Sequence, residues 1–303
     1  MATYRVGGVL LPYAPIMIGA GVCKTPKVAQ EWLVVAPVVS GSYTPERREG
    51  NKGNQLFYPD TEEEFLKQGF GLNSFGMPNM GFTATAQEFM KYGGENPLIV
   101  SIAGFDVGDY VAGVKAFAGV PNIRASELNF GCPNTEHGKI MSFDLASLEK
   151  VFRELKGLSA TPMWAKFSPY SDPGLLKEVA HVVNATASVV KAVVICNTFP
   201  NAYAGKGAIS PNNGLAGLSG PALKPIALGQ VAQFRQHLNP EIDVIGIGGT
   251  ITGNDVIDFL DAGAKAVQLT SLPFWSSNPG RFWESLLNAD TGDRLEKYLN
   301  NEL

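Results

Sequence analysis

Cysteine and histidine are scarce in this chain of 303 residues. It has three histidines and three cysteines, which are Cys23, Cys132 and Cys196, and the cysteines form no C-x-x-C pair. A sparse and odd set of this kind argues against a disulfide framework and against a zinc-finger type of metal site. It is typical of a reducing compartment, and we therefore expect a cytoplasmic protein with no bound metal.

Long apolar runs and clusters of positive charge are also missing. We find no stretch of about 18 consecutive apolar residues and no signal-peptide pattern at the start. The 24 basic and 28 acidic side chains give a formal net charge of −4, without a long basic run. These features argue against a membrane protein and against nucleic acid as a partner.

Short apolar runs alternate with helix-like stretches along most of the chain, after an apolar start that suggests a β-hairpin. The expected strands are residues 15–19, 34–40, 97–103, 122–130, 163–167, 189–196, 242–247 and 264–269. The expected helices are residues 27–33, 84–92, 106–117, 144–158, 174–183, 221–238, 254–262 and 281–299. Residues 41–71 and 205–220 are expected to be long loops at the active site.

Eight strand-then-helix units point to the α/β class. Sequential βαβ units are parallel with right-handed crossovers, and eight of them in about 250 residues predict a closed (β/α)8 TIM barrel. A doubly wound sheet is the alternative, but no G-x-G-x-x-G opens a helix near the N-terminus. We expect one domain that spans residues 1–303.

The C-terminal ends of the expected strands carry amides, hydroxyls, one amine and one thiol. The functional site of a barrel of this kind lies at these ends. Gly248 and Gly249 follow the seventh strand, and Thr270 and Ser271 follow the eighth. Glycines at this place let backbone N–H groups approach a phosphate, so the pattern predicts phosphate binding, with ordinary turn glycines as the alternative.

Lys166 ends the fifth expected strand, and Cys132 follows the fourth between Asn129 and Asn134. The lysine can hold the anionic edge of a cofactor, act as a Schiff-base amine, or simply reach solvent at the rim. A thiol with a pKa of about 8.5 is suited to removing a carbon-bound proton near neutral pH. Cys196 lies within a strand, where we expect it to be a small buried apolar residue.

Several segments of the chain together resemble the dihydroorotate dehydrogenases, most closely the soluble class whose catalytic base is cysteine. They are residues 127–134 (ELNFGCPN), 73–79 (NSFGMPN), 247–255 (IGGTITGND) and 47–51 (RREGN). The resemblance runs over nearly the whole chain. It implies an FMN-dependent CH–CH oxidoreductase of pyrimidine biosynthesis, usually a homodimer, that acts on dihydroorotate or a related ring. It also implies a separate electron-acceptor subunit in part of the family.

The resemblance assigns roles to individual residues. Cys132 would take a proton from the substrate ring while hydride passes to flavin N5, and Lys166 would offset the charge that develops on the flavin. The implied substrate-binding residues are Asn73, Asn79, Asn129, Asn134, Asn197 and Thr198. The implied cofactor-binding residues are Ala20, Gly21, Ser42, Asn129, Lys166, Asn197, Gly217, Gly220, Gly248, Gly249, Thr270 and Ser271.

The chain departs from the family at the end of the second strand. The family places there a lysine that touches both flavin and substrate, and this chain has Gly41, with Arg47, Arg48 or Lys52 as candidate substitutes. A charge-assisted hydrogen bond contributes roughly 1.5–3 kcal/mol, so its loss opens an alternative. That alternative is a different dihydropyrimidine or an enone-type ring without the carboxylate. Two further alternatives are a Schiff-base aldolase that uses Lys166 and a non-catalytic flavin-binding barrel.

Overall fold

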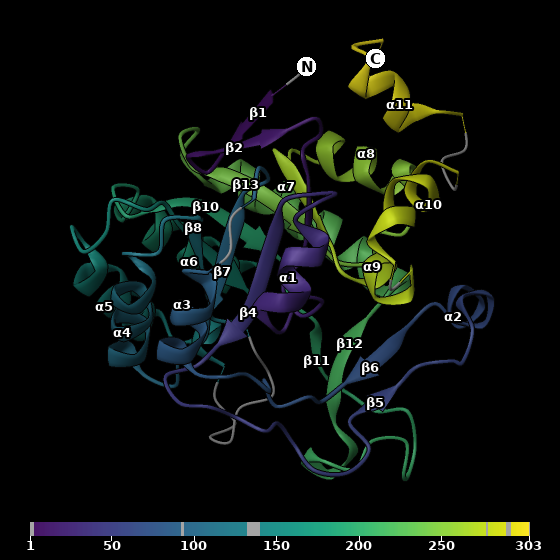
Figure 1. The fold of residues 1–303 in the computed structure, drawn as a ribbon, viewed down its shortest axis with the longest axis horizontal. Coiled ribbons are helices and arrows are strands. Elements are labelled where there is room, and N and C mark those ends of the chain that lie inside the picture. Colours follow the sequence, from purple (N-terminus) through teal and green to yellow (C-terminus); the bar gives the residue numbers. More distant parts are fainter. Residues whose placement is uncertain (1–2, 92–93, 132–139, 277, 289–291, 303) are drawn as a thin grey trace.

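A closed barrel of eight parallel strands forms the centre of the computed structural model, which describes residues 3–91, 94–131, 140–276, 278–288 and 292–302. The strands follow one another around the barrel in chain order, which confirms the predicted (β/α)8 fold (Figure 1). They are β3 (Ile16–Ile18), β4 (Val38–Tyr43), β7 (Leu98–Ile102), β8 (Ile123–Asn129), β9 (Met163–Phe167), β10 (Val190–Ile195), β13 (Asp243–Ile247) and β14 (Ala266–Leu269).

Helices surround the barrel, and most of them bury apolar side chains against it (Figure 1). Polar N-caps start several of them, as at Asp106 and Asp172, whose side chains accept backbone N–H groups of the first turn. The α-helices are α1 (Pro26–Trp32), α2 (Glu62–Gln68), α3 (Phe82–Phe89), α4 (Val107–Phe117), α5 (Leu145–Leu155), α6 (Pro173–Ala185), α7 (Lys224–His237), α8 (Gly253–Asp261), α9 (Ser271–Ser276), α10 (Phe282–Asn288) and α11 (Arg294–Leu299). Short 3₁₀ helices are η1 (Met141–Phe143), η2 (Asn212–Gly214), η3 (Pro221–Leu223) and η4 (Pro279–Arg281). No described helix is both long enough and apolar enough to cross a bilayer.

The two ends of the barrel are closed differently. At the N-terminal end, β1 (Thr3–Val6) and β2 (Val9–Pro12) form the predicted hairpin. Its turn is fixed by two hydrogen bonds: Gly7 N–H donates to Asp243 Oδ2 at 2.8 Å, and Trp164 Nε1 donates to Gly7 O at 2.9 Å. At the opposite end lies an antiparallel sheet in the order β11-β12-β6-β5 (Figure 1). Its strands are β5 (Leu56–Phe57), β6 (Gly71–Asn73), β11 (Phe199–Ala202) and β12 (Ala216–Ser219).

The assignment of residues 41–71 and 205–220 to loops was wrong in part, because these segments supply α2 and most of the second sheet. The strands β5, β6 and β12 have only two to four residues each. Strands of this length show no clear alternation of apolar and polar residues, so periodicity does not reveal them. They pair with one another across the barrel mouth, which sequence order alone does not predict.

The element boundaries differ most from the prediction at two places. The expected second strand starts later, at Val38, because Val35 N–H donates to Trp32 O at 3.0 Å and so continues the turn after α1. Val34 is 77% exposed, and Pro37 separates this turn from the strand. Residues 281–299, expected as one helix, contain the separate helices α10 and α11.

Candidate active site at the barrel mouth

The barrel interior changes from apolar to polar along its strands. Side chains on a strand alternate between its two faces, so residues two apart share a face. Ala125 on β8 and Trp164 on β9 belong to the apolar cluster next to the hairpin. Two residues further along the same faces come Glu127 and Lys166, and Asn129 then follows on β8. On these two strands the interior therefore presents its ionisable and amide groups towards the mouth.

A buried ion pair lies beneath the mouth. Lys166 Nζ is 3.5 Å from Glu127 Oε1, and Gln268 Nε2 on β14 donates to Glu127 Oε2 at 2.7 Å. Lys166 is 3% exposed, and the other two side chains are fully buried. Breaking such a pair by removing one partner leaves an uncompensated buried charge. Lys166 is therefore a fixed cation rather than a mobile amine at the rim.

A cavity of about 160 Å³ opens above this pair, and we name it the polar cavity. Gly21, Ser42, Asn73 and Asn129 are the expected site residues that line the polar cavity but not the adjoining cavity described next. An adjoining cavity of about 70 Å³, the phosphate-side cavity, has Gly248 and Gly249 in its wall. The expected residues shared by both cavities are Ala20, Lys166, Asn197, Thr198, Thr270 and Ser271. The structure thus brings these residues from many strands to one place.

A chain of hydrogen bonds fixes the amides of the polar cavity. Asn129 Nδ2 donates to Ser42 Oγ at 2.8 Å, and Asn197 Nδ2 donates to Asn129 Oδ1 at 3.0 Å. Asn197 Oδ1 in turn accepts the Thr198 N–H at 2.8 Å, and Gly131 N–H donates to Asn129 Oδ1 at 3.2 Å. Since the amides of Asn129 and Asn197 are each held by a neighbour, the orientation of their donors and acceptors is set before a ligand arrives.

Unpaired polar groups gather around the phosphate-side cavity. Thr250 Oγ1, Thr270 Oγ1 and Gln268 Oε1 are buried and have no hydrogen-bond partner within the described part of the chain. Buried polar groups are normally paired, so these three atoms indicate a missing polar ligand. Gly249 has a φ of +78°, and a Cβ there would lie 2.8 Å from Gly220 O. The cradle therefore depends on glycine at this position.

Hydrogen bonds at the start of α8 fix the loop that follows β13 beside the phosphate-side cavity. Asp255 Oδ2 accepts the N–H groups of Ile251 and Thr252, both at 2.8 Å. Lys224 forms an ion pair with Asp255 and donates to Asp258 Oδ2 at 2.7 Å. The positive end of the helix dipole favours an anion near this loop.

Lys24 is the cation of the polar cavity that the sequence analysis missed. It lines the cavity together with Gly41 and Asn73, and its Nζ lies 3.4 Å from the ring centroid of Phe75. Burial lowers the pKa of Lys24 from its usual range. A signal was available, because Lys24 stands three residues after Gly21 at the end of the first strand.

The expected substitutes for the family lysine lie elsewhere. Arg47 is exposed and pairs with Glu49 at 2.8 Å, and Lys52 is exposed as well. Arg48 Nε donates to Gly76 O at 3.1 Å. None of the three is among the described residues that line the polar cavity.

Asn79 is the one expected substrate-binding residue, among those described, that lines neither cavity. Its Oδ1 accepts the N–H groups of Thr44 and Gly81, at 3.2 and 2.8 Å. Its Nδ2 donates to Thr44 Oγ1 and to Met77 O, both at 2.8 Å. Because the whole amide is already used, this placement gives Asn79 a structural role in the loop rather than contact with substrate.

The remaining expected residues have different outcomes. Gly217 pairs with Asn73 in the second sheet, and Gly220 lies behind Gly249. Cys132 and Asn134 lie outside the described residues.

The two described cysteines are both buried. Burial raises the pKa of Cys23 and of Cys196 to about 12. Neither thiol is therefore ionised near neutral pH, and the prediction that Cys196 is a buried apolar residue is confirmed.

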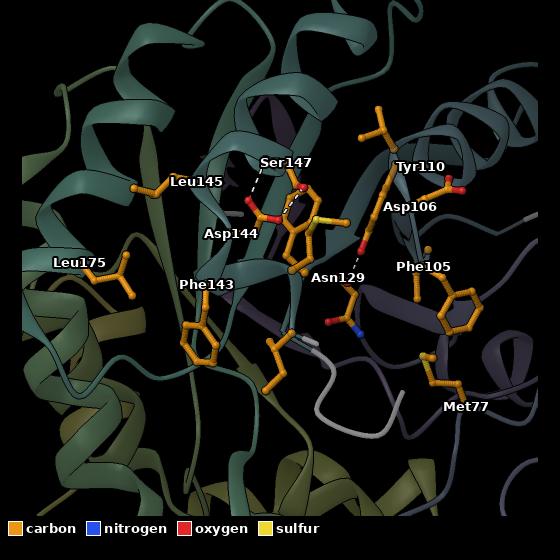
Figure 2. Close-up of a pocket in the computed structure, with 16 residues that line it drawn as sticks. Met77, Phe105, Asp106, Tyr110, Asn129, Phe143, Asp144, Leu145, Ser147 and Leu175 are labelled. Carbon is orange, nitrogen blue, oxygen red and sulfur yellow. Dashed lines mark hydrogen bonds between the residues drawn. The ribbon is translucent and has the colours of Figure 1, made fainter. Parts of the chain in front are cut away.

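A larger cavity of about 860 Å³ lies beside the mouth, at the starts of α4 and α5 (Figure 2). Figure 2 shows Tyr110 and Asn129 on one side of it, joined by a hydrogen bond of 2.9 Å from Tyr110 Oη to Asn129 O. Asp144 and Ser147 lie at the start of α5. Among the described residues, Asn129 is the one expected site residue in its wall. Among all the residues that the structure describes, no group of three or more His, Cys, Asp or Glu side chains could hold a metal ion.

Fold and site together define a (β/α)8 barrel with a phosphate-type loop after its seventh strand and a pocket of amides beside it. The chain belongs to the dihydroorotate dehydrogenase family, whose model matches residues 5–278. It is 31% identical over 265 residues to "Dihydroorotate dehydrogenase A (fumarate)" of Lactococcus lactis subsp. cremoris (strain MG1363), covering 84% of this chain and 83% of that protein.

One further relative and one solved structure are also similar to this chain. It is 32% identical over 270 residues to "Dihydroorotate dehydrogenase B (NAD(+)), catalytic subunit" of Methanopyrus kandleri, covering 85% of this chain and 81% of the relative. The crystal structure of an Eimeria tenella DHODH in complex with ferulenol superposes with a TM-score of 0.75 at 19% identity, covering 94% of this chain and 83% of that one. This last likeness shows the shared fold.

Proposed function

We propose that this chain is an FMN-dependent dihydroorotate dehydrogenase, which oxidises a CH–CH bond of a dihydropyrimidine ring. The observation that carries the proposal is the fixed amide pair Asn129 and Asn197 next to Lys166, in a cavity that continues into the phosphate-side cavity. Membership of the family supports the reaction class.

The residues present fit FMN. The unpaired Thr250 and Thr270 hydroxyls and the glycines at 248 and 249 suit a phosphate, and the unpaired Gln268 Oε1 suits a hydroxyl of the ribityl chain. Lys166 suits the edge of the flavin ring that gains negative charge on reduction.

Each of the two cavities is smaller than the roughly 300–1,000 Å³ that is usual for drug-sized ligands. We therefore expect side chains at the mouth to move outward when FMN binds. Phe274 is 38% exposed, and its ring lies 5.2 Å from that of Tyr58, with both rings in the cavity wall.

The chain's own groups then have distinct tasks. Bound FMN would supply the acceptor for a hydride. Cys132, the base that the family resemblance implies, takes a proton from one carbon of the substrate ring, next to the carbon that loses the hydride. Asn129 and Asn197 orient this ring. The raised pKa values of Cys23 and Cys196 leave these two thiols protonated and unsuited to the task.

Lys24 supports dihydroorotate rather than a ring without a carboxylate. It supplies a cation to the polar cavity although Gly41 has none. The aldolase alternative is not favoured, because Lys166 is paired with Glu127 at 3.5 Å and the relatives are dehydrogenases.

Replacing Lys24 by methionine is expected to raise the KM for dihydroorotate about 10- to 100-fold, the equivalent of a lost charge-assisted contact. Because burial lowers the pKa of Lys24, affinity should fall as pH rises through a value below the usual lysine pKa of about 10.4, and the variant should lack this dependence. Steady-state kinetics against pH measure both effects. The Lys52→Met variant is the control, and equal KM values in both variants would refute the role of Lys24.

A second variant tests the phosphate cradle. Gly249→Ala is expected to lower the flavin content of the purified protein at least tenfold, because the new Cβ would lie 2.8 Å from Gly220 O at a φ of +78°. Gly229→Ala on α7 is the matched control, since a Cβ there meets nothing within 4 Å. Flavin released on denaturation is quantified for both, and full flavin content in Gly249→Ala would contradict the assignment.

The substrate is tested by comparing dihydroorotate with dihydrouracil, which lacks the carboxylate. We expect the purified protein to contain FMN and to prefer dihydroorotate by at least tenfold in kcat/KM. A preference for dihydrouracil would favour the alternative ring, and a protein that turns over neither would count against the proposal.

The proposal also covers the electron acceptor, the oligomeric state and the cellular location of the protein. The names of the relatives mention fumarate and NAD(+), the latter for a catalytic subunit. The resemblance supports a homodimer in the cytoplasm. Oxidation of the dihydroorotate-reduced protein by fumarate alone would place it with the first group, and a requirement for a second subunit would place it with the other.

A further inference from the structure

Glu127 is a buried carboxylate that lines neither of the two site cavities. It lies one layer below them, where Oε2 accepts from Gln268 Nε2 at 2.7 Å and Oε1 lies 3.5 Å from Lys166 Nζ. Glu127 Oε1 makes no hydrogen bond within the described residues, so its interaction with Lys166 is mainly that of two charges.

The pair is shielded from water and therefore interacts strongly. Glu127 and Gln268 are fully buried, and Lys166 is 3% exposed. Charges in such a place are screened much less than at a surface. Lys166 also lines both cavities, so its ammonium group stands between the carboxylate and any ligand above it. The negative charge of Glu127 therefore partly cancels the positive potential that Lys166 exerts on a ligand in the cavities.

We propose that Glu127 is a positioning residue that holds Lys166 towards the flavin and lowers the reduction potential of the bound flavin by tempering the lysine's positive charge. This inference rests on the proposed function. The flavin ring gains negative charge when it is reduced, and a nearby cation stabilises that charge while a nearby anion destabilises it. Glu127 therefore holds the bound flavin at a potential from which electrons still pass on to the acceptor.

The Glu127→Gln variant tests the inference because it removes the charge and keeps the shape. The oxygen of the new amide can still accept from Gln268 Nε2, and a neutral NH2 group takes the place of the charged Oε1 beside Lys166. We expect the equilibrium for reduction of bound FMN to shift at least tenfold towards the reduced form, which is about 30 mV for a two-electron couple. Dye-equilibration titration of the holoprotein measures the potential directly.

Two further variants complete the experiment. Asp243→Asn removes a carboxylate at the opposite end of the barrel, where Asp243 binds the hairpin turn, and its potential should equal that of the wild type. Glu127→Asp keeps the negative charge but moves it away from Lys166. We therefore expect its reduction potential to rise as in Glu127→Gln, by a smaller amount. Should Glu127→Gln not yield holoprotein, Glu127→Asp decides the question alone.

The outcomes separate this inference from the proposed function. A yellow wild type whose flavin dihydroorotate reduces, together with an unchanged or lowered potential in the Glu127 variants, overturns the inference and leaves the function standing. A wild type that binds no flavin overturns both. A raised potential in Glu127→Gln and not in Asp243→Asn supports the inference, since a purely structural role would not shift the two variants differently.

Discussion

The Lys166→Met variant is expected to lose roughly 10²–10³ in the rate of flavin reduction by dihydroorotate, the usual effect of removing one preorganised charge partner. Among the described residues, Lys166 is the one that joins all parts of the site: it lines both cavities and pairs with Glu127 at 3.5 Å. Methionine has a similar length and no charge, so the change removes the ammonium group and little else. Rapid-mixing absorbance under anaerobic conditions measures the rate.

The variant also leaves the buried Glu127 carboxylate without its partner charge. This loss alone is expected to destabilise the fold by about 3–5 kcal/mol. The double variant Lys166→Met, Glu127→Gln removes both charges and separates lost stability from lost chemistry. Lys191→Met, on the neighbouring strand β10 and half-buried, is the control for a lysine outside the site. A double variant that folds and reduces its flavin at the wild-type rate would refute the role of Lys166.

The Cys132→Ser variant is expected to lower kcat for dihydroorotate oxidation by roughly 10²–10⁴, the range that general-base catalysis contributes. The chain leading to this residue is fixed, because Gly131 N–H donates to Asn129 Oδ1 at 3.2 Å and Ser168 Oγ donates to Gly131 O at 3.1 Å. The wild-type rate should rise with pH through the thiol pKa, which is about 8.5 without perturbation, because only the thiolate accepts the proton. The rate of the serine variant should still be rising with pH above this value.

Cys23→Ala is the matched control for this variant. Burial raises the pKa of Cys23 to about 12, so it is a buried thiol without a role as base, and its removal should leave the pH profile unchanged. If Cys132→Ser kept the wild-type rate and pH profile, the base would have to be another group.

The barrel was predictable because its signals are local and repeated. Runs such as residues 163–167 and 189–196 are apolar except for one lysine each and are separated by helix-length segments, and β9 and β10 lie within those predicted limits. The second sheet was not predictable in this way. Its strands are very short, and their pairing partners are distant in sequence, as when Gly217 pairs with Asn73.

The site was predictable where a strand end alone places a residue at the mouth. Asn129, Lys166 and Asn197 stand at such ends and meet at the polar cavity. Asn79 and Lys24 show the limit of this reasoning, since both stand in loops. Local hydrogen bonds to Thr44 and to its own loop occupy Asn79, whereas Lys24 lines the cavity with its Nζ over the Phe75 ring.

The most direct test of the account is the anaerobic addition of dihydroorotate to the purified protein. The account predicts that the protein is yellow from bound FMN and that one equivalent of dihydroorotate bleaches the flavin absorbance. A colourless protein, or a yellow protein whose absorbance stays constant after dihydroorotate is added, would contradict it.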